Sequence, residues 1–128
     1  MNLLLDTHLL LWAAGASARL SPAARKLIED PAHTLWFSAA SLWEITIKSN
    51  LGRDDFQADP ALLRRGLIEN GYHELPITCE HVIAVGRLPD LHRDPFDRVL
   101  IAQAELEGLL LLTADERVAA YRGPIRHV

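Results

Sequence analysis

Four acidic residues occupy positions from which their carboxylates could share a metal ion. These residues are Asp6, Glu44, Asp97 and Asp115. Asp6 directly follows an apolar run at 3–5, and Asp115 comes shortly after a second apolar run at 109–112. Carboxylates about 4 Å apart repel one another by several kcal/mol at an intermediate dielectric, so such a cluster requires a cation or shared protons. Carboxylate oxygens without cysteine or paired histidine ligands favour Mg²⁺ or Mn²⁺ over zinc.

Asp97 is the acid that is hardest to explain as a purely structural residue. Apolar residues follow it at the third, fourth and seventh positions, which places Asp97 on the helix face that packs against the core. A buried carboxylate without a partner is costly, and the helix N-terminus compensates only part of that cost. Asp94 lies three residues earlier, where capping the same helix is a sufficient role. We therefore expect Asp97 to bind a metal; the alternative is a first-turn acid that supports the cap.

Each of the other acids also has a structural interpretation. Asp6 and Asp115 both precede a predicted helix and would serve as N-caps. Glu44 is followed four residues later by Lys48, an order that gives a helix ion pair worth about 0.3 kcal/mol. The acids taken together therefore indicate a site more strongly than any one of them does.

The elements that would position these acids alternate along the chain. Apolar and β-branched runs predict strands at 3–5, 34–37, 75–77, 109–112 and 125–128. Capping residues, prolines and glycines predict helices at 7–14, 23–29, 38–48, 60–70, 78–87 and 95–107, with a short one from 116. This alternation predicts an α/β fold: one domain over residues 1–128, with a mostly parallel sheet of four to five short strands and helices on both faces. In such sheets, sites form at the carboxyl ends of the strands, where Asp6 and Asp115 fall.

The composition restricts the class of protein. The chain has 128 residues and a net charge of −4, which argues against a broadly basic surface that coats nucleic acid. A negative enzyme acting on a polyanion must neutralise its own site, which again indicates bound cations. No apolar run reaches the roughly 18 residues of a membrane span, and the N-terminus lacks a signal peptide's basic lead, so no membrane association is expected.

The cysteine and the histidines add little chemistry of their own. Cys79 is the only cysteine and cannot form an internal disulfide, so we expect a reducing cytoplasm. The six histidines show no zinc-binding spacing. His8 and His92 lie near the acids in the sequence, and whether they join the site stays open.

Four stretches of the sequence, in this order, form a recognisable pattern. They are LLDTH at 4–8, SLWEI at 41–45, HRDPFDR at 92–98 with LIAQA at 100–104, and LTAD at 112–115. The pattern resembles the PIN-domain family, specifically the VapC-type toxins of bacterial toxin–antitoxin pairs, and it spans nearly the whole chain. The four acids of that family fall on Asp6, Glu44, Asp97 and Asp115.

The resemblance implies an activity and a set of ligands. It implies a Mg²⁺-dependent (or Mn²⁺-dependent) endoribonuclease that acts as the toxin and hydrolyses RNA phosphodiester bonds. One or two ions would be held chiefly by Asp6 and Asp97. The secondary ligands would be Glu44, Asp115 and, with less support, Asp94. Thr113 would order a metal-bound water or a site carboxylate.

Other residues near the acids have two interpretations each. Arg98 would contact phosphate or pair with an acid, or it is a plain surface guanidinium.

The resemblance also implies an antitoxin protein that blocks the site, a toxin homodimer and a toxin–antitoxin hetero-oligomer. Trp12, Trp36 and Trp43 would anchor such a partner, or they belong to the core.

Proteins of other classes fit the sequence less well. A phospho-accepting receiver-like domain and haloacid-dehalogenase-like phosphatases need a further acid beside the first one, and here Thr7 and His8 follow Asp6. A catalytically silent PIN-fold binding module is disfavoured by the intact set of acids. Flap-type DNA nucleases of the wider family are longer.

Overall fold

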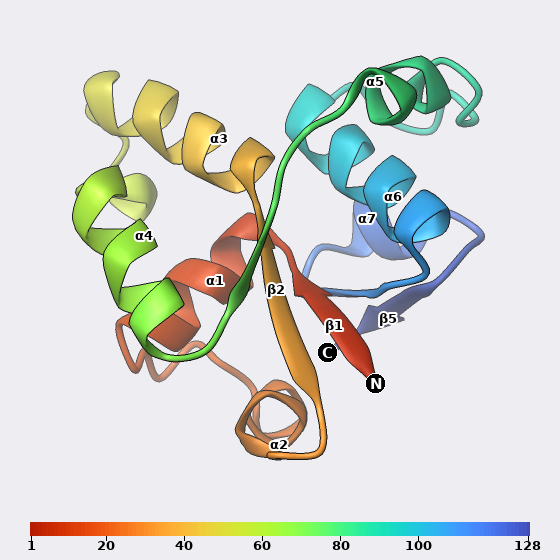
Figure 1. The fold of residues 1–128 in the computed structure, drawn as a ribbon. Coiled ribbons are helices and arrows are strands. Elements are labelled where there is room, and N and C mark those ends of the chain that lie inside the picture. Colours follow the sequence, from red (N-terminus) through yellow and green to blue (C-terminus); the bar gives the residue numbers. More distant parts are fainter.

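The computed structural model describes residues 1–128 and places a five-stranded parallel sheet at the centre (Figure 1). The strands are β1 (Asn2–Leu5), β2 (Thr34–Ser38), β3 (His73–Leu75), β4 (Leu110–Thr113) and β5 (Ile125–His127). Their spatial order is β3-β2-β1-β4-β5, and every pairing is parallel. The predicted α/β fold with a parallel sheet is therefore confirmed.

Helices connect the strands and cover both faces of the sheet. They are α1 (Thr7–Ala14), α2 (Pro22–Glu29), α3 (Ala39–Asn50), α4 (Pro60–Glu69), α5 (Cys79–Val85), α6 (Pro95–Glu107) and α7 (Glu116–Ala119), with a 3₁₀ turn, η1, at Asp54–Phe56. Three of them begin at a proline directly after a capping side chain, as the sequence predicts: α2 after Ser21, α4 after Asp59 and α6 after Asp94.

The core consists of two layers because side chains alternate across each strand. Leu3 and Leu5 of β1 pack with α1, α2 and α4 on one face, whereas Leu4 packs with α6 and α7 on the other. Burying each of these leucines contributes about 2 kcal/mol. With both faces covered, the carboxyl ends of the strands remain free for a site; in Figure 1 these ends point upward, toward α3 and α6.

The strand order fixes where that site lies. From β1 the chain proceeds to β2 and β3 on one side, and later to β4 and β5 on the other. The connections leaving β1 and β4 therefore diverge, and a crevice opens outside the carboxyl ends of these two strands. Asp6 follows β1 and Asp115 follows β4, so both acids lie at this crevice.

The third strand differs from its predicted position. It was predicted at 75–77, but β3 runs from His73 to Leu75, and its last pair joins Leu75 to Ser38. The strand ends there because Pro76 has no N–H to donate to the next ladder bond. The turn η1 was not predicted, since no hydrophobic period marks a three-residue element.

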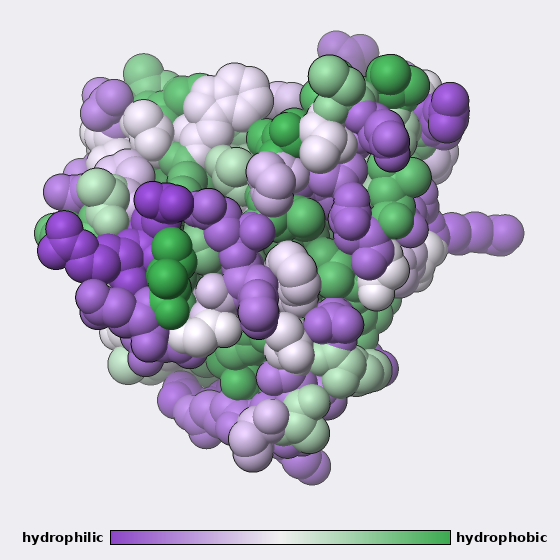
Figure 2. All heavy atoms as spheres, viewed as in Figure 1, coloured by the Kyte–Doolittle hydropathy of each residue, from purple (hydrophilic) through white to green (hydrophobic).

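Several apolar side chains remain on the surface. None of the helices is long and apolar enough to span a bilayer. Trp43 and Ile47 of α3 and Val82 and Ile83 of α5 are exposed. In the view of Figure 2, apolar groups gather over α3 and α5. Of the three tryptophans, Trp43 is thus available to a partner, whereas the other two pack partly against the core.

Candidate active site

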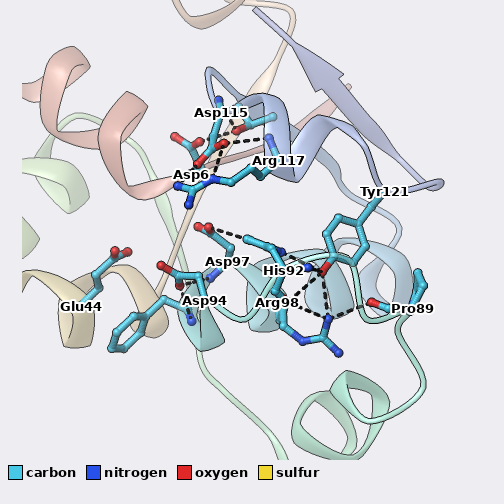
Figure 3. Close-up of polar contacts among 12 residues, drawn as sticks. Asp6, Glu44, Pro89, His92, Asp94, Asp97, Arg98, Asp115, Arg117 and Tyr121 are labelled. Carbon is cyan, nitrogen blue, oxygen red and sulfur yellow. Dashed lines mark hydrogen bonds and ion pairs between the residues drawn. The ribbon is translucent and has the colours of Figure 1, made fainter.

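A small polar pocket of about 100 Å³ opens at the carboxyl ends of β1 and β4. It is lined by Asp6, Thr7, His8, Glu44, Lys48, Arg53, Phe56, Asp94, Asp97, Asp115 and Arg117. The structure therefore brings together all five acids that were predicted from the sequence, although they lie on elements far apart in the chain (Figure 3). Three cationic side chains share the pocket with them.

Asp6 is held rigidly at the end of β1. Its Oδ1 accepts a hydrogen bond from the N–H of Leu9 at 2.9 Å, which caps α1, and its Oδ2 accepts one from Thr113 Oγ1 at 2.6 Å. Burial raises the pKa of the Asp6 carboxyl, and these two hydrogen bonds oppose that rise. Capping and a position in the pocket are thus compatible, since each oxygen retains a free lone pair.

Asp94 and Asp97 divide their roles within the first turn of α6. Asp94 Oδ1 caps the helix, accepting from the N–H groups of Phe96 at 2.9 Å and Asp97 at 3.0 Å. The Asp97 carboxylate takes no part in the cap, and its Oδ2 lies 3.1 Å from His92 Nε2. Burial, followed by the negative charge of Asp94, raises the pKa of Asp97 to about 6, while the hydrogen bond from His92 opposes the rise.

Glu44 is buried in α3 and has one oxygen without a partner. The ammonium of Lys48 donates to Glu44 Oε2, so the predicted helix ion pair forms. Oε1 is nevertheless the one buried side-chain oxygen or nitrogen without a hydrogen bond. Lys48 Nζ also lies 3.9 Å from Asp94 Oδ2 and 4.6 Å from the centroid of the Phe56 ring. An orphaned buried carboxylate oxygen is costly, which indicates a further positive partner at this position.

Asp115 is the most exposed of the predicted ligands, and it forms an ion pair with Arg117. Its Oδ1 accepts from the N–H of Arg117 at 2.8 Å and caps α7, and its Oδ2 lies 3.0 Å from Arg117 Nη2. The Arg117 guanidinium holds the pKa of the Asp115 carboxyl below its usual range. Thr113 Oγ1 accepts from the N–H of Asp115 at 3.0 Å, so the threonine that donates to Asp6 also fixes the backbone of Asp115.

Arg98 does not pair with an acid, contrary to one of its two predicted roles. Its guanidinium donates to Tyr121 Oη at 2.8 Å and to the carbonyl oxygen of Pro89 at 2.9 Å, among other backbone carbonyls. Arg98 is one residue beyond Asp97, a rotation of about 100° around the helix, which turns it away from the acids. Tyr121 was missed entirely, because no pattern in the sequence links it to Asp97.

Both histidines left open by the sequence contact the pocket. His92 contacts Asp97, as described above. His8 Nε2 lies 3.3 Å from Asp55 Oδ2, and its ring centroid lies 4.9 Å from that of Phe56, with the two rings tilted by 48°. His8 therefore forms part of the pocket wall near η1. Arg53 was also missed, because its place in the wall depends on the unpredicted turn.

The donor set fits a hard divalent cation. The pocket offers five carboxylates, and one buried carboxylate oxygen lacks a partner. Burial, and then the negative charge of the neighbouring acids, raises the pKa of Asp97. As they stand, no three Asp, Glu, His or Cys side chains are close enough to bind one ion. Side-chain rotation within the pocket is therefore required for three oxygens to converge on a metal.

Comparison with known proteins relates the chain to a family. The family model described as "PIN domain" matches residues 3–124. Among solved structures, the chain is similar to VapBC2 from Rickettsia felis bound to a promoter DNA fragment, with a TM-score of 0.69, 13% identity and coverage of 99% of this chain and 98% of that one. No curated protein sequence matches significantly.

Two further structures show the same fold. DNA-bound VapBC from Salmonella typhimurium gives a TM-score of 0.68 at 17% identity, covering 100% of this chain and 97% of that one. VapC20 from Mycobacterium tuberculosis, described as a sarcin–ricin loop cleaving toxin, gives 0.64 at 13% identity, covering 94% and 96%. At these identities the likeness establishes the fold.

Proposed function

The chain belongs to the PIN domain family, and on that premise we propose that it is a divalent-metal-dependent endoribonuclease, the toxin of a toxin–antitoxin pair. The observation that carries the proposal is that five carboxylates line one pocket, in the crevice at the carboxyl ends of β1 and β4. They come from the ends of β1 and β4, from α3 and from the first turn of α6. The solved structures with this fold include toxin–antitoxin complexes and a toxin that cleaves the sarcin–ricin loop.

Within the proposed site, Asp6 and Asp97 are the main ligands. Glu44 and Asp115 complete the set, directly or through water, and Asp94 contributes only the oxygen that does not cap α6. A bound Mg²⁺ or Mn²⁺ would lower the pKa of a water molecule and stabilise charge on the scissile phosphate.

The chain's own residues prepare the pocket for a polyanionic substrate. Thr113 holds Asp6 by a 2.6 Å hydrogen bond, so the ligand does not need to be ordered when the ion arrives. Lys48, Arg53 and Arg117 line the same pocket and supply positive charge beside the acids. The protein has a net charge of −4, so it repels RNA phosphates overall. The three cations offset this repulsion at the acidic pocket.

The proposed partners are a cognate antitoxin protein and a second copy of the chain. The support comes from the relatives, several of which are solved as toxin–antitoxin complexes. Co-expression with the product of the neighbouring reading frame should give a stable complex and relieve growth inhibition. Light scattering of the purified chain should give twice the monomer mass. A free monomer unaffected by its genetic neighbour would contradict the partner proposal.

A receiver-like domain is no longer a competing interpretation. Receivers have the strand order 2-1-3-4-5, whereas this sheet has β3-β2-β1-β4-β5. The remaining alternative is a catalytically silent PIN-fold module. The intact pocket with its unpartnered Glu44 oxygen favours a metal-binding enzyme over that alternative.

Cleavage of structured RNA by the purified chain tests the proposal. We expect cleavage in Mg²⁺ or Mn²⁺, none in EDTA, and none by Asp6→Asn or Asp97→Asn. Asp90→Asn is the matched control, because Asp90 is exposed and outside the pocket. Full cleavage by either pocket variant would refute the assignment, and preferential cleavage of flap DNA would redirect it. Sequencing of RNA ends after induction would identify the target.

A further inference from the structure

A chain of hydrogen bonds runs from Arg98 to Asp97 behind the pocket (Figure 3). Arg98 Nη1 lies 2.8 Å from Tyr121 Oη, Tyr121 Oη lies 2.8 Å from His92 Nδ1, and His92 Nε2 lies 3.1 Å from Asp97 Oδ2. Tyr121 is buried, and the side chain of His92 is only 8% exposed. The hydrogen bonds that Tyr121 and His92 make with each other and with Asp97 are therefore shielded from water. Their partners within the protein determine which atoms carry the protons.

The direction of each hydrogen bond follows from the chemistry of its donor. A guanidinium has no acceptor, so Arg98 donates to Tyr121 Oη. The backbone N–H of His92 also points to that oxygen, at 3.4 Å. Tyr121 has a single O–H proton, and its two nearby acceptors are His92 Nδ1 at 2.8 Å and the His92 carbonyl at 3.5 Å. The tyrosine therefore donates to Nδ1, which must be unprotonated.

We propose that Tyr121, oriented by Arg98, holds the His92 ring with Nδ1 as the acceptor and Nε2–H as the donor, and thereby makes His92 a positioning residue for Asp97. With Nδ1 accepting, the ring proton lies on Nε2 and is donated to Asp97 Oδ2. Asp97 Oδ1 makes no hydrogen bond with the protein and is left to face the pocket's other acids. The opposite tautomer would present a lone pair to the carboxylate, and Asp97 would lose its only side-chain donor.

The arrangement restrains Asp97 through Oδ2 before any cation binds. This part of the inference rests on the proposed function, in which Asp97 is a main ligand. Partners behind a metal ligand commonly change metal affinity by about 10-fold to 100-fold when they are removed. Arg98 and Tyr121 thus act on the pocket without lining it, and Tyr121 is buried close to this polar site.

The tautomer is tested directly by ¹⁵N NMR of histidine-labelled protein at alkaline pH without metal. We expect one protonated nitrogen, Nε2, and one unprotonated nitrogen, Nδ1, in the ring whose signals vanish in His92→Gln. Tyr121→Phe removes the donor and should abolish this single-tautomer pattern. Tyr72→Phe, at the only other tyrosine, is the matched control and should preserve it. An Nδ1–H ring, a doubly protonated ring, or an unchanged pattern in Tyr121→Phe would overturn the proposal.

Mn²⁺ titration followed by electron paramagnetic resonance tests the consequence for the pocket. We expect Tyr121→Phe and His92→Leu to weaken Mn²⁺ binding by about 10-fold or more. His92→Gln places an amide N–H near the Nε2 position and should retain most of the affinity, which separates positioning from packing. If the wild type binds no Mn²⁺, the proposed function fails while the NMR result on the tautomer stands. If Tyr121→Phe binds Mn²⁺ as the wild type does, the positioning role fails.

Discussion

Replacing Asp97 by asparagine should stabilise the metal-free protein at neutral and alkaline pH. The pKa of Asp97 rises from 3.8 in the unfolded chain to about 6 in the folded protein. Each pKa unit corresponds to about 1.4 kcal/mol, so the ionised carboxylate lowers the free energy of unfolding by about 3 kcal/mol above pH 6. Asparagine has nearly the same shape, and its carbonyl oxygen can still accept from His92.

The sign of the pH dependence follows from proton binding. Between pH 3.8 and about 6, the folded protein holds a proton on Asp97 that the unfolded chain has released. Stability therefore falls as the pH rises through this range, which is opposite to the behaviour of a salt-bridged aspartate. Between pH 4.5 and pH 8 the free energy of unfolding of the wild type should fall by about 2 kcal/mol relative to that of Asp97→Asn.

Urea unfolding in EDTA at these two pH values measures the difference, since the other titrating groups are common to both proteins. Adding Mg²⁺ at pH 8 should raise the stability of the wild type and leave that of Asp97→Asn nearly unchanged. Asp90→Asn serves as the control for a change in net charge. The reasoning would be refuted if the free energies of unfolding of the wild type and Asp97→Asn differed by the same amount at both pH values. The Asp97 carboxylate would then have the same pKa in the folded and the unfolded protein.

Three further substitutions probe the sheet and the pocket. Thr113→Val removes the donor to Asp6 without changing volume; urea unfolding should show a loss of about 1–3 kcal/mol, and Mn²⁺ affinity should fall, whereas an unchanged affinity would contradict the role of Thr113. Lys48→Met leaves the buried Glu44 without its cation and should cost about 3 kcal/mol at pH 8 in EDTA, recovered in part by Mg²⁺; no loss would show that the ion pair is dispensable. Leu4→Ala in the central strand should cost about 3 kcal/mol in the same assay, and a loss below 1 kcal/mol would contradict the packing of β1.

Local patterns were sufficient for most of the fold. The Asp-Pro and Ser-Pro pairs mark helix starts because capping and a fixed φ act within one turn. The third strand was misplaced because its boundary depends on the ladder that β3 forms with β2, which a local pattern does not contain. The turn η1 has no periodicity at all, so its contribution to the pocket wall could not be predicted.

The site was predictable only in part, for the same reason. Asp6 and Asp115 follow apolar strands, and the topology of a parallel sheet places such residues together. The polar partners depend on the tertiary fold: Tyr121 meets His92 only because α7 returns beside the start of α6. The orientation of Arg98 depends on the helix geometry: Asp97 faces the pocket, and Arg98, about 100° further around the helix, faces Tyr121.

The bond between Thr113 and Asp6 joins residues 107 positions apart in the sequence. During synthesis, β1 can therefore pair on both of its sides only after β4 has been made. A nascent chain that ends before β4 has neither the donor to Asp6 nor Asp115, so the pocket cannot assemble on it. Whatever chemistry the pocket performs thus begins only after Thr113 and Asp115 have been synthesised, and translation products that end before them lack it.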